Sequence, residues 1–186
     1  MAVREILLLG NPILRQKCGK VKDFTGPGNP RLIRDLQDTL GDFRKRHGFG
    51  RGIAAPQIGV AKRIVFIDVG KPLPLINPEI TKRSRESMAL WDDCFSFPDI
   101  LVKVRRSAVI MMSFQDDRGR RQSIKAEGGL SELLQHEIDH LDGILAIDRA
   151  IAATQIILRS EWEKLMKTSS RSVRKKQRIQ YGSLQR

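Results

Sequence analysis

An apolar stripe that carries an HExxH sequence is the feature that most constrains the fold of this chain. The apolar positions recur at helical spacing and are Leu130, Leu133, Leu134, Ile138 and Leu141. They predict a helix that ends near Gly143. The HExxH sequence, from His136 to His140, lies inside this helix. A helix with so many apolar side chains has to bury them against other segments, so we expect it at the centre of the fold.

The two histidines of the HExxH sequence are one helical turn apart. Positions four apart lie on one helix face, about 6 Å from each other, so His136 and His140 can bind the same divalent metal ion. Glu137 lies beside them, near enough to act on a water molecule at the metal. Only three histidines occur in the chain, and because two have this spacing we interpret the pair as a metal site. The third, His47, is interpreted as a solvated residue at a helix end.

A metal that does chemistry needs a third protein ligand and an open position. The residues alone leave two candidates open: Cys94, and a downstream acid, either Glu161 or Glu163. A thiolate bound to a divalent ion is fully deprotonated, and Cys94 precedes a predicted strand at 100–104 that would hold it in place. The other cysteine, Cys18, is assigned to the core.

A segment rich in glycine and small residues, from Gly50 to Gly59, is the third candidate for function. Its small residues, among them Gly50 and Gly52, would let a backbone or a ligand approach closely. Gln57 supplies an amide donor that could polarise a carbonyl group. The segment lacks the lysine and the following hydroxyl residue of a phosphate-binding loop.

Hydrophobic periodicity predicts the remaining elements. We expect an irregular arm over 1–28 and a helix over 30–47 with Asn29 as its N-cap. The other predicted elements are strands at 63–69, 100–104, 108–114 and 121–126, a hairpin turn at 116–119 and a third helix that begins near Ser160. Strands in one block between helices predict a single α+β domain.

Composition excludes several classes of protein. Lys and Arg total 34 against 21 Asp and Glu, and the net charge is +13. A basic surface of this kind attracts polyanions without choosing a sequence, and aromatic residues, at 5%, are too few to favour single-strand stacking. Two cysteines do not make a disulfide scaffold. The apolar runs are too short for a membrane span and no export signal is evident, so we expect a cytoplasmic protein.

Three motifs in this order resemble the peptide deformylases. They are the glycine-x-glycine-x-alanine-alanine-proline-glutamine segment that ends at Gln57, the motif around Cys94, and Gln135 followed by HExxH. The resemblance covers most of residues 1–150. It implies an α+β catalytic domain over 1–165, with antiparallel or mixed sheets packed around the HExxH helix and with a C-terminal helix. A basic tail over 166–186, which we expect to be mobile, would follow.

The resemblance also implies the reaction and the metal. The enzyme would remove the formyl group from the N-formylmethionine of nascent polypeptides and release formate. Cys94, His136 and His140 would be the metal ligands, with Fe²⁺ as the physiological ion and Zn²⁺ or Ni²⁺ as substitutes.

The resemblance assigns roles to further residues. Glu137 would carry the proton from water to the departing amine, while Gln57 and the backbone N–H of Phe95 would stabilise the charge that develops on oxygen. The residues expected to contact the substrate are Gly50, Arg51, Gly52, Ile53, Asp93 and Leu133.

The sequence departs from the family pattern near the expected substrate path. The usual glutamate-glycine-cysteine-leucine-serine motif is replaced by Asp92, Asp93, Cys94, Phe95 and Ser96. Arg51 stands where an apolar residue is common, and Glu132 lies one turn before His136, where the helix usually helps to line the methionine pocket. Because a charged pocket would bind methionine poorly, we expect Glu132 to turn outward or to pair with a cation such as Arg51.

Two alternatives to this enzyme remain. One is a zinc peptidase whose third ligand is Glu161 or Glu163. The other is a noncatalytic relative that binds nascent chains or RNA through its basic surface. Residues 161–186 contain eight Lys or Arg and two Glu, and a tail with this net charge of +6 would permit docking on the ribosome. A bacterial cytoplasm is expected, and an organelle less so.

Overall fold

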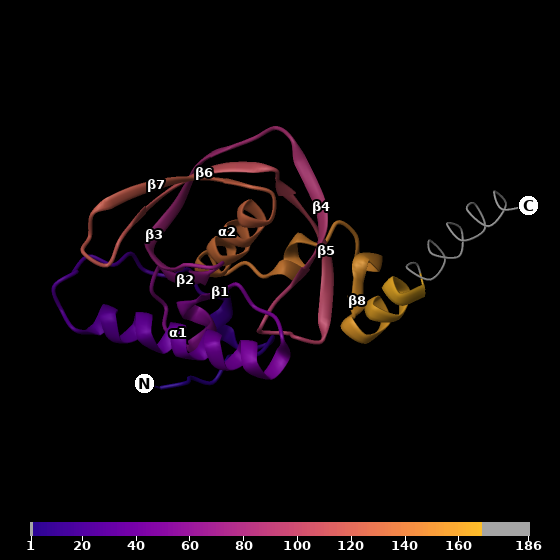
Figure 1. Cartoon of the computed structure of the whole chain (residues 1–186), viewed down its shortest axis with the longest axis horizontal. Helices are drawn as coiled ribbons and strands as arrows, with labels where there is room; N and C mark the ends of the chain where they lie inside the picture. The colour runs from indigo at the N-terminus through magenta and orange to yellow at the C-terminus, as the bar shows by residue number, and fades with distance from the viewer. Residues whose placement is uncertain (1, 169–186) are drawn as a thin grey trace, which may run out of the picture.

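The computed structural model describes residues 2–168, which form an α+β domain (Figure 1). The helices are α1 (Gly28–His47), α2 (Gly128–Leu141) and a helical segment over 159–168. The strands are β1 (Gly52–Ala54), β2 (Ile64–Asp68), β3 (Pro72–Arg83), β4 (Ser87–Asp93), β5 (Ile100–Ser107), β6 (Val109–Gln115), β7 (Arg121–Glu127) and β8 (Ile156–Leu158). The predicted fold class is confirmed.

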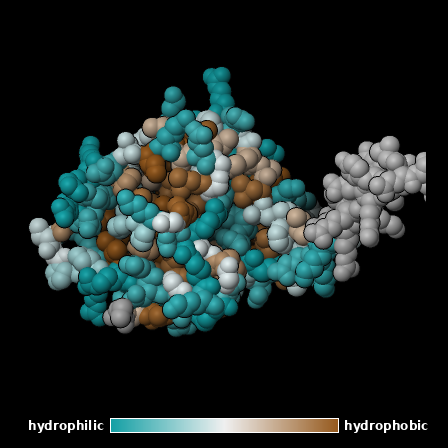
Figure 2. All heavy atoms as spheres, viewed as in Figure 1, coloured by the Kyte–Doolittle hydropathy of each residue, from teal (hydrophilic) through white to brown (hydrophobic). Residues whose placement is uncertain are grey.

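The strands form two antiparallel sheets. One has the order β1-β2-β3-β6-β7 and the other β4-β5-β8. Figure 1 shows α2 enclosed between the two sheets and α1 along the side where β1 and β2 lie. Figure 2, viewed from the same side as Figure 1, shows apolar residues gathered in the middle of the visible face, with hydrophilic ones around them.

The helix with the HExxH sequence, α2, is buried over most of its length. Every residue from Ser131 to Leu141 is buried, and its leucines pack against β2, β3 and β6. Burial of a complete helix requires cover on all sides, which the two sheets and the N-terminal arm provide. The predicted central position of this helix is therefore confirmed.

The first helix begins slightly earlier than expected. Its N-cap is Pro27, and Asn29 lies within the first turn, where its amide donates to the backbone oxygen of Asp23 at 2.6 Å. The predicted role of Asn29 as N-cap is therefore wrong. The apolar face of α1, with Leu36, Leu40 and Phe43, packs on β1 and β2.

Four strands were missed by the sequence analysis, namely β1, β3, β4 and β8. Prolines interrupt the apolar pattern of β3, which tolerates them because its first residues pair on one side only and Pro78 lies in an irregularity of the pairing with β6. The hairpin of β4 and β5 places Cys94 directly after a strand, as well as before the predicted one. The thiol is thus anchored from both sides.

The C-terminal region supports only part of the prediction. The segment over 159–168 is helical, as expected near Ser160, and it continues past the predicted domain boundary at residue 165. Residues 169–186 lie outside the described residues, so the basic mobile tail over 166–186 stays a prediction. No helix within residues 2–168 has the length and apolar character that crossing a membrane requires.

Candidate metal centre and substrate cavity

Cys94, His136 and His140 converge at the centre of the fold. The Nε2 atom of His140 lies 3.2 Å from the sulfur of Cys94 and 3.2 Å from Nε2 of His136. All three side chains are buried, and their potential ligand atoms lie within 4.8 Å of one another. The hairpin of β4 and β5 thus brings the sulfur to the face of α2 on which the HExxH spacing places both imidazoles.

These three side chains fit a divalent metal ion. One thiolate and two imidazoles are donors that suit zinc and iron, and three of them leave a coordination position open. The nearby Oε2 of Glu137 is buried and has no hydrogen-bond partner in the described part of the chain. A buried carboxylate oxygen without a partner needs an explanation, and a water molecule at the metal would supply the missing contact.

Asp92 holds His136 in the orientation that metal binding needs. Its Oδ1 lies 2.9 Å from Nδ1 of His136, which leaves Nε2 to face the other two ligands. Its Oδ2 accepts from Arg106 on β5 at 2.9 Å. Arg106 also contacts Asp139 of α2, and Arg149 donates to Asp139 at 2.8 Å.

Sequence reasoning did not find this buried network. It passed over Arg106 altogether. The available signal was that Arg106 continues the alternate positions of Val102 and Val104 in strand β5, which face the interior.

Burial and the charges of this network shift the pKa values of two carboxyl groups at the site, those of Asp92 and Glu137. Burial by itself would raise the pKa of Asp92, but His136 and Arg106 outweigh it and lower the pKa to about 2. Burial raises the pKa of Glu137 to about 7, with the nearby carboxylates of Asp92 and Glu132 adding to the rise and His136 and Arg51 opposing it. Glu137 is therefore the carboxyl that can exchange a proton near neutral pH.

Gln57 is fixed with its amide nitrogen toward the thiol. Its Oε1 accepts from the backbone N–H of Ala54 at 2.9 Å, which determines the orientation of the amide. Its Nε2 then lies 3.6 Å from the sulfur of Cys94 and 3.5 Å from Oγ of Ser96. The side chain is 2% exposed and borders the cavity described next.

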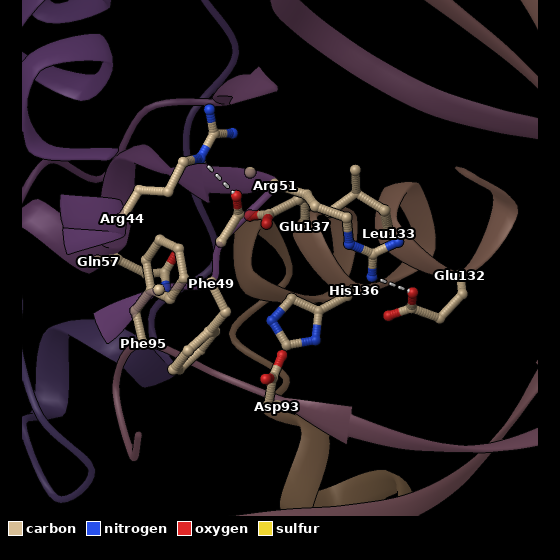
Figure 3. A pocket seen from close by; sticks show the side chains of 13 residues that line it. Arg44, Phe49, Arg51, Gln57, Asp93, Phe95, Glu132, Leu133, His136 and Glu137 are labelled. Carbon is tan, nitrogen blue, oxygen red and sulfur yellow. Dashed lines mark hydrogen bonds and ion pairs between the residues drawn. The ribbon is translucent and has the colours of Figure 1, made fainter. Parts of the chain in front are cut away.

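A cavity of about 440 Å³ opens beside His136 and Glu137 (Figure 3). Its lining residues are Arg44, Gly48, Phe49, Gly50, Arg51, Gly52, Gln57, Asp93, Phe95, Glu132, Leu133, His136 and Glu137. Two glycines are required by close contacts. A Cβ on Gly52 would lie 2.6 Å from Oε1 of Glu137, and one on Gly50 would lie 2.6 Å from the ring of Phe95. The glycine spacing therefore makes room both for Glu137 and for the wall of the cavity.

One predicted substrate residue, Ile53, does not reach this cavity. It is completely buried in the core between α1 and β2. Successive residues of a strand point to opposite sides, so when Gly52 faces the cavity its neighbour faces the core. The other residues predicted to contact the substrate, Gly50, Arg51, Gly52, Asp93 and Leu133, all line the cavity.

The charged residues that depart from the family pattern are paired. Arg51 lies 2.5 Å from a carboxylate oxygen of Glu132 and also donates to the backbone oxygen of Gly129 at 3.0 Å. The pairing that we expected for Glu132 is thus present. Asp93 accepts from Arg159 at 2.9 Å. Arg51, Glu132 and Asp93 therefore each have a partner of opposite charge at the cavity wall.

The peptidase alternative lacks its metal ligand. Glu161 forms an exposed ion pair with Lys164. Within residues 2–168, the groups that could hold a metal contain neither Glu161 nor Glu163. The second such group joins Asp92, Glu132 and His136, and two of these are already engaged with Arg106 and Arg51.

Comparison with known proteins agrees with this site. A sequence model of the family described as polypeptide deformylase matches residues 3–155. A peptide deformylase of Desulfitobacterium hafniense is 44% identical over 153 residues, which are 81% of this chain and 96% of the relative. One of Rhizobium meliloti is 38% identical and covers 80% of this chain and 85% of its own.

Solved structures give the same result. The crystal structure of peptide deformylase from Thermotoga maritima aligns with a TM-score of 0.75 at 35% identity, over 82% of this chain and all of its own. A Synechococcus elongatus peptide deformylase in complex with actinonin aligns with a TM-score of 0.76 at 32% identity, over 82% of this chain and 81% of its own. With its cysteine and two histidines gathered beside a cavity, the chain belongs to the polypeptide deformylase family.

Proposed function

We propose that this chain hydrolyses the formyl amide of N-formylmethionine at the start of nascent polypeptides, with Cys94, His136 and His140 as metal ligands. The observation that carries the proposal is the convergence of one sulfur and two ring nitrogens within 4.8 Å, beside Glu137 and the cavity. The products are formate and a free amino terminus. Family membership makes the chain an enzyme, which argues against a relative that only binds nascent chains or RNA.

Cys94, His136 and His140 would hold a divalent ion, Fe²⁺ or in its place Zn²⁺ or Ni²⁺. When bound, the ion would act as a Lewis acid and lower the pKa of a water molecule to near neutral, which the side chains alone cannot do. Glu137 accepts the proton that the water loses and passes it to the departing amine. A carboxyl with a pKa of about 7 can do both at neutral pH.

Gln57 and Phe95 stabilise the negative charge that develops on the formyl oxygen. The amide of Gln57 is already oriented by its bond to Ala54, so its Nε2 donates without reorganisation. The backbone N–H of Phe95, the residue after Cys94, is the second donor. Its aromatic ring stacks on Phe43 at 3.8 Å between centroids, which fixes this part of the chain.

The cavity receives the first residue of the peptide. Leu133 supplies apolar surface, and Gly50 and Gly52 let the peptide backbone approach. Pairing with Glu132 removes the net charge of Arg51, whose methylene groups can then cover an apolar side chain. The cytoplasm, where nascent chains are made, is the proposed location, and docking of the basic tail on the ribosome is part of the same hypothesis.

A formate-release assay with a formyl-methionyl tripeptide tests the proposal. The protein is loaded with Fe²⁺ without oxygen. Cys94→Ser is expected to lower metal content and abolish turnover, and Gln57→Ala to lower kcat by about 10²- to 10³-fold with metal content unchanged. Glu161→Gln is the matched control and should keep both. A Cys94→Ser protein that binds metal and releases formate like the wild type would refute the assignment.

A further inference from the structure

Arg159 connects the C-terminal helical segment to the substrate cavity. It is the first residue of the segment over 159–168 and lies beyond the part of the chain that the family model matches. Its backbone N–H donates to Asp99 at 2.8 Å. Its side chain donates to the backbone oxygen of Pro98 at 2.8 Å and to the carboxylate of Asp93 at 2.9 Å.

The same guanidinium group also packs on Phe49. Its central carbon lies 4.1 Å from the centroid of the Phe49 ring, a distance at which a cation is attracted by the face of an aromatic ring. Phe49 and Asp93 both line the cavity, one from the loop after α1 and the other from the end of β4 (Figure 3). One side chain therefore joins two walls that come from distant parts of the sequence.

The position of Arg159 is itself fixed by strand pairing. It follows β8 directly, and Leu158 pairs with Ile100 in the sheet that contains β4. The side chain is only 22% exposed. Because its backbone is held by strand pairing and its side chain is largely enclosed, Arg159 loses little conformational entropy when it forms its contacts at the cavity wall.

Charge gives this contact a consequence for the substrate. The cavity lining includes the carboxylates of Asp93, Glu132 and Glu137. Glu132 has Arg51 as its partner, and Arg159 is the residue that forms an ion pair with Asp93. Without Arg159, the carboxylate of Asp93, which is 36% exposed at the cavity, would attract basic groups and repel acidic groups of a bound peptide.

We propose that Arg159 is a positioning residue that sets the charge preference of the substrate cavity. It neutralises Asp93 and holds Phe49, so that the C-terminal segment completes the cavity wall and peptides are accepted whether the residue after methionine is acidic or basic. This inference rests on the proposed deformylase function.

The test compares two formylated tripeptides that differ only at the residue after methionine, which is Lys in one peptide and Glu in the other. For Arg159→Ala, we expect the ratio of kcat/KM for the Lys peptide to that for the Glu peptide to rise about three- to fivefold, mainly through KM. Arg159→Lys should keep the ratio of the wild type. The double variant Asp93→Asn/Arg159→Ala should also restore it, since no carboxylate is left to neutralise.

Lys164→Ala provides the matched control, because it removes a cation of the same helical segment that pairs with Glu161 away from the cavity. It should leave the ratio unchanged. An Arg159→Ala ratio equal to that of the wild type would overturn the inference, as would a shifted ratio that the double variant fails to restore, since a merely structural role would behave in that way.

A binding measurement separates this inference from the proposed function. If the wild-type protein released no formate, the deformylase proposal would fail, and calorimetric titration with Met-Lys and Met-Glu dipeptides would then carry the test. The ratio of the two Kd values should change between the wild type and Arg159→Ala as the kinetic ratio does. An unchanged Kd ratio would reject the role of Arg159 independently of turnover.

Discussion

Two sets of ion pairs surround the active site, and they differ in burial. The inner set joins Asp92, Arg106 and Asp139 behind His136, and the side chains of Arg106 and Asp92 are 4% and 2% exposed. The outer set lies at the cavity and pairs Arg159 with Asp93 and Arg51 with Glu132. The side chains of Asp93 and Arg51 are 36% and 46% exposed, and that of Glu132 is 7% exposed. Arginine–carboxylate pairs therefore lie both in the low-dielectric interior and at a cavity that water reaches.

The difference shows how burial determines what an ion pair does. Inside the protein, a charge without its partner is very costly, so the inner pairs fix one arrangement of β4, β5 and α2 around the metal ligands. At the cavity, water screens the charges, so the outer pairs contribute little to stability and chiefly control what the cavity accepts. The neighbours Asp92 and Asp93 illustrate this, since they point to opposite sides of β4 and serve one set each.

The strongest test of this comparison is the removal of Arg106. Arg106→Met removes the buried cation that Asp92 and Asp139 share, and it leaves Asp139 with the half-exposed Arg149 alone. We expect a loss of about 3 to 5 kcal/mol in the free energy of unfolding, measured by urea denaturation. Arg149→Met is the control, because Arg149 is 44% exposed and should cost about 1 kcal/mol or less. Equal losses for the two variants would contradict the distinction.

Asp92 and Asp93 give a second test through metal affinity. Asp92→Asn weakens the contact that orients His136, so metal affinity should fall by about 10- to 100-fold in competition with a chelator. Asp93→Asn changes a carboxylate that faces the cavity and should leave the affinity unchanged. If both variants lost metal equally, the two sides of β4 would not have separate functions.

The smallest expected effect concerns the outer pair itself. Arg51→Met leaves a largely buried Glu132 carboxylate without its cation and should cost about 1 to 2 kcal/mol in the free energy of unfolding. Glu132→Leu leaves an arginine that water can reach and should cost less than about 1 kcal/mol. Thermal and urea unfolding of both variants measure this difference. A larger loss of stability for Glu132→Leu than for Arg51→Met would contradict the prediction.

Much of the fold could be predicted because the signals are local. The apolar periodicity of α1 and α2, the β-branched run of β2 and the strand-like segments of β5, β6 and β7 are visible within a few residues, and the structure confirms these elements. The strand β3 was missed because prolines break its pattern, and the neighbours that accommodate them are distant in the sequence. The burial of the Ile53 side chain has a similar origin, since the side of β1 that faces the core depends on α1 and β2.

The site was predictable only in part. The residues alone left Cys94, Glu161 and Glu163 open as the third ligand, and the family resemblance favoured the cysteine. Sequence reasoning missed Arg106 because its partners lie 14 and 33 residues away along the chain and have no fixed spacing. The contact of Arg159 with the cavity wall spans 66 residues and escaped notice for the same reason.

The sequence by itself determined that His136 and His140 share one face of a buried helix, because the geometry of a helix fixes the positions of residues four apart. Only the tertiary structure decided which sulfur or acid meets those imidazoles and which charges at the cavity are neutralised. Those contacts join separate segments, and their distances depend on how the β4–β5 hairpin and the C-terminal segment pack, which no local pattern encodes.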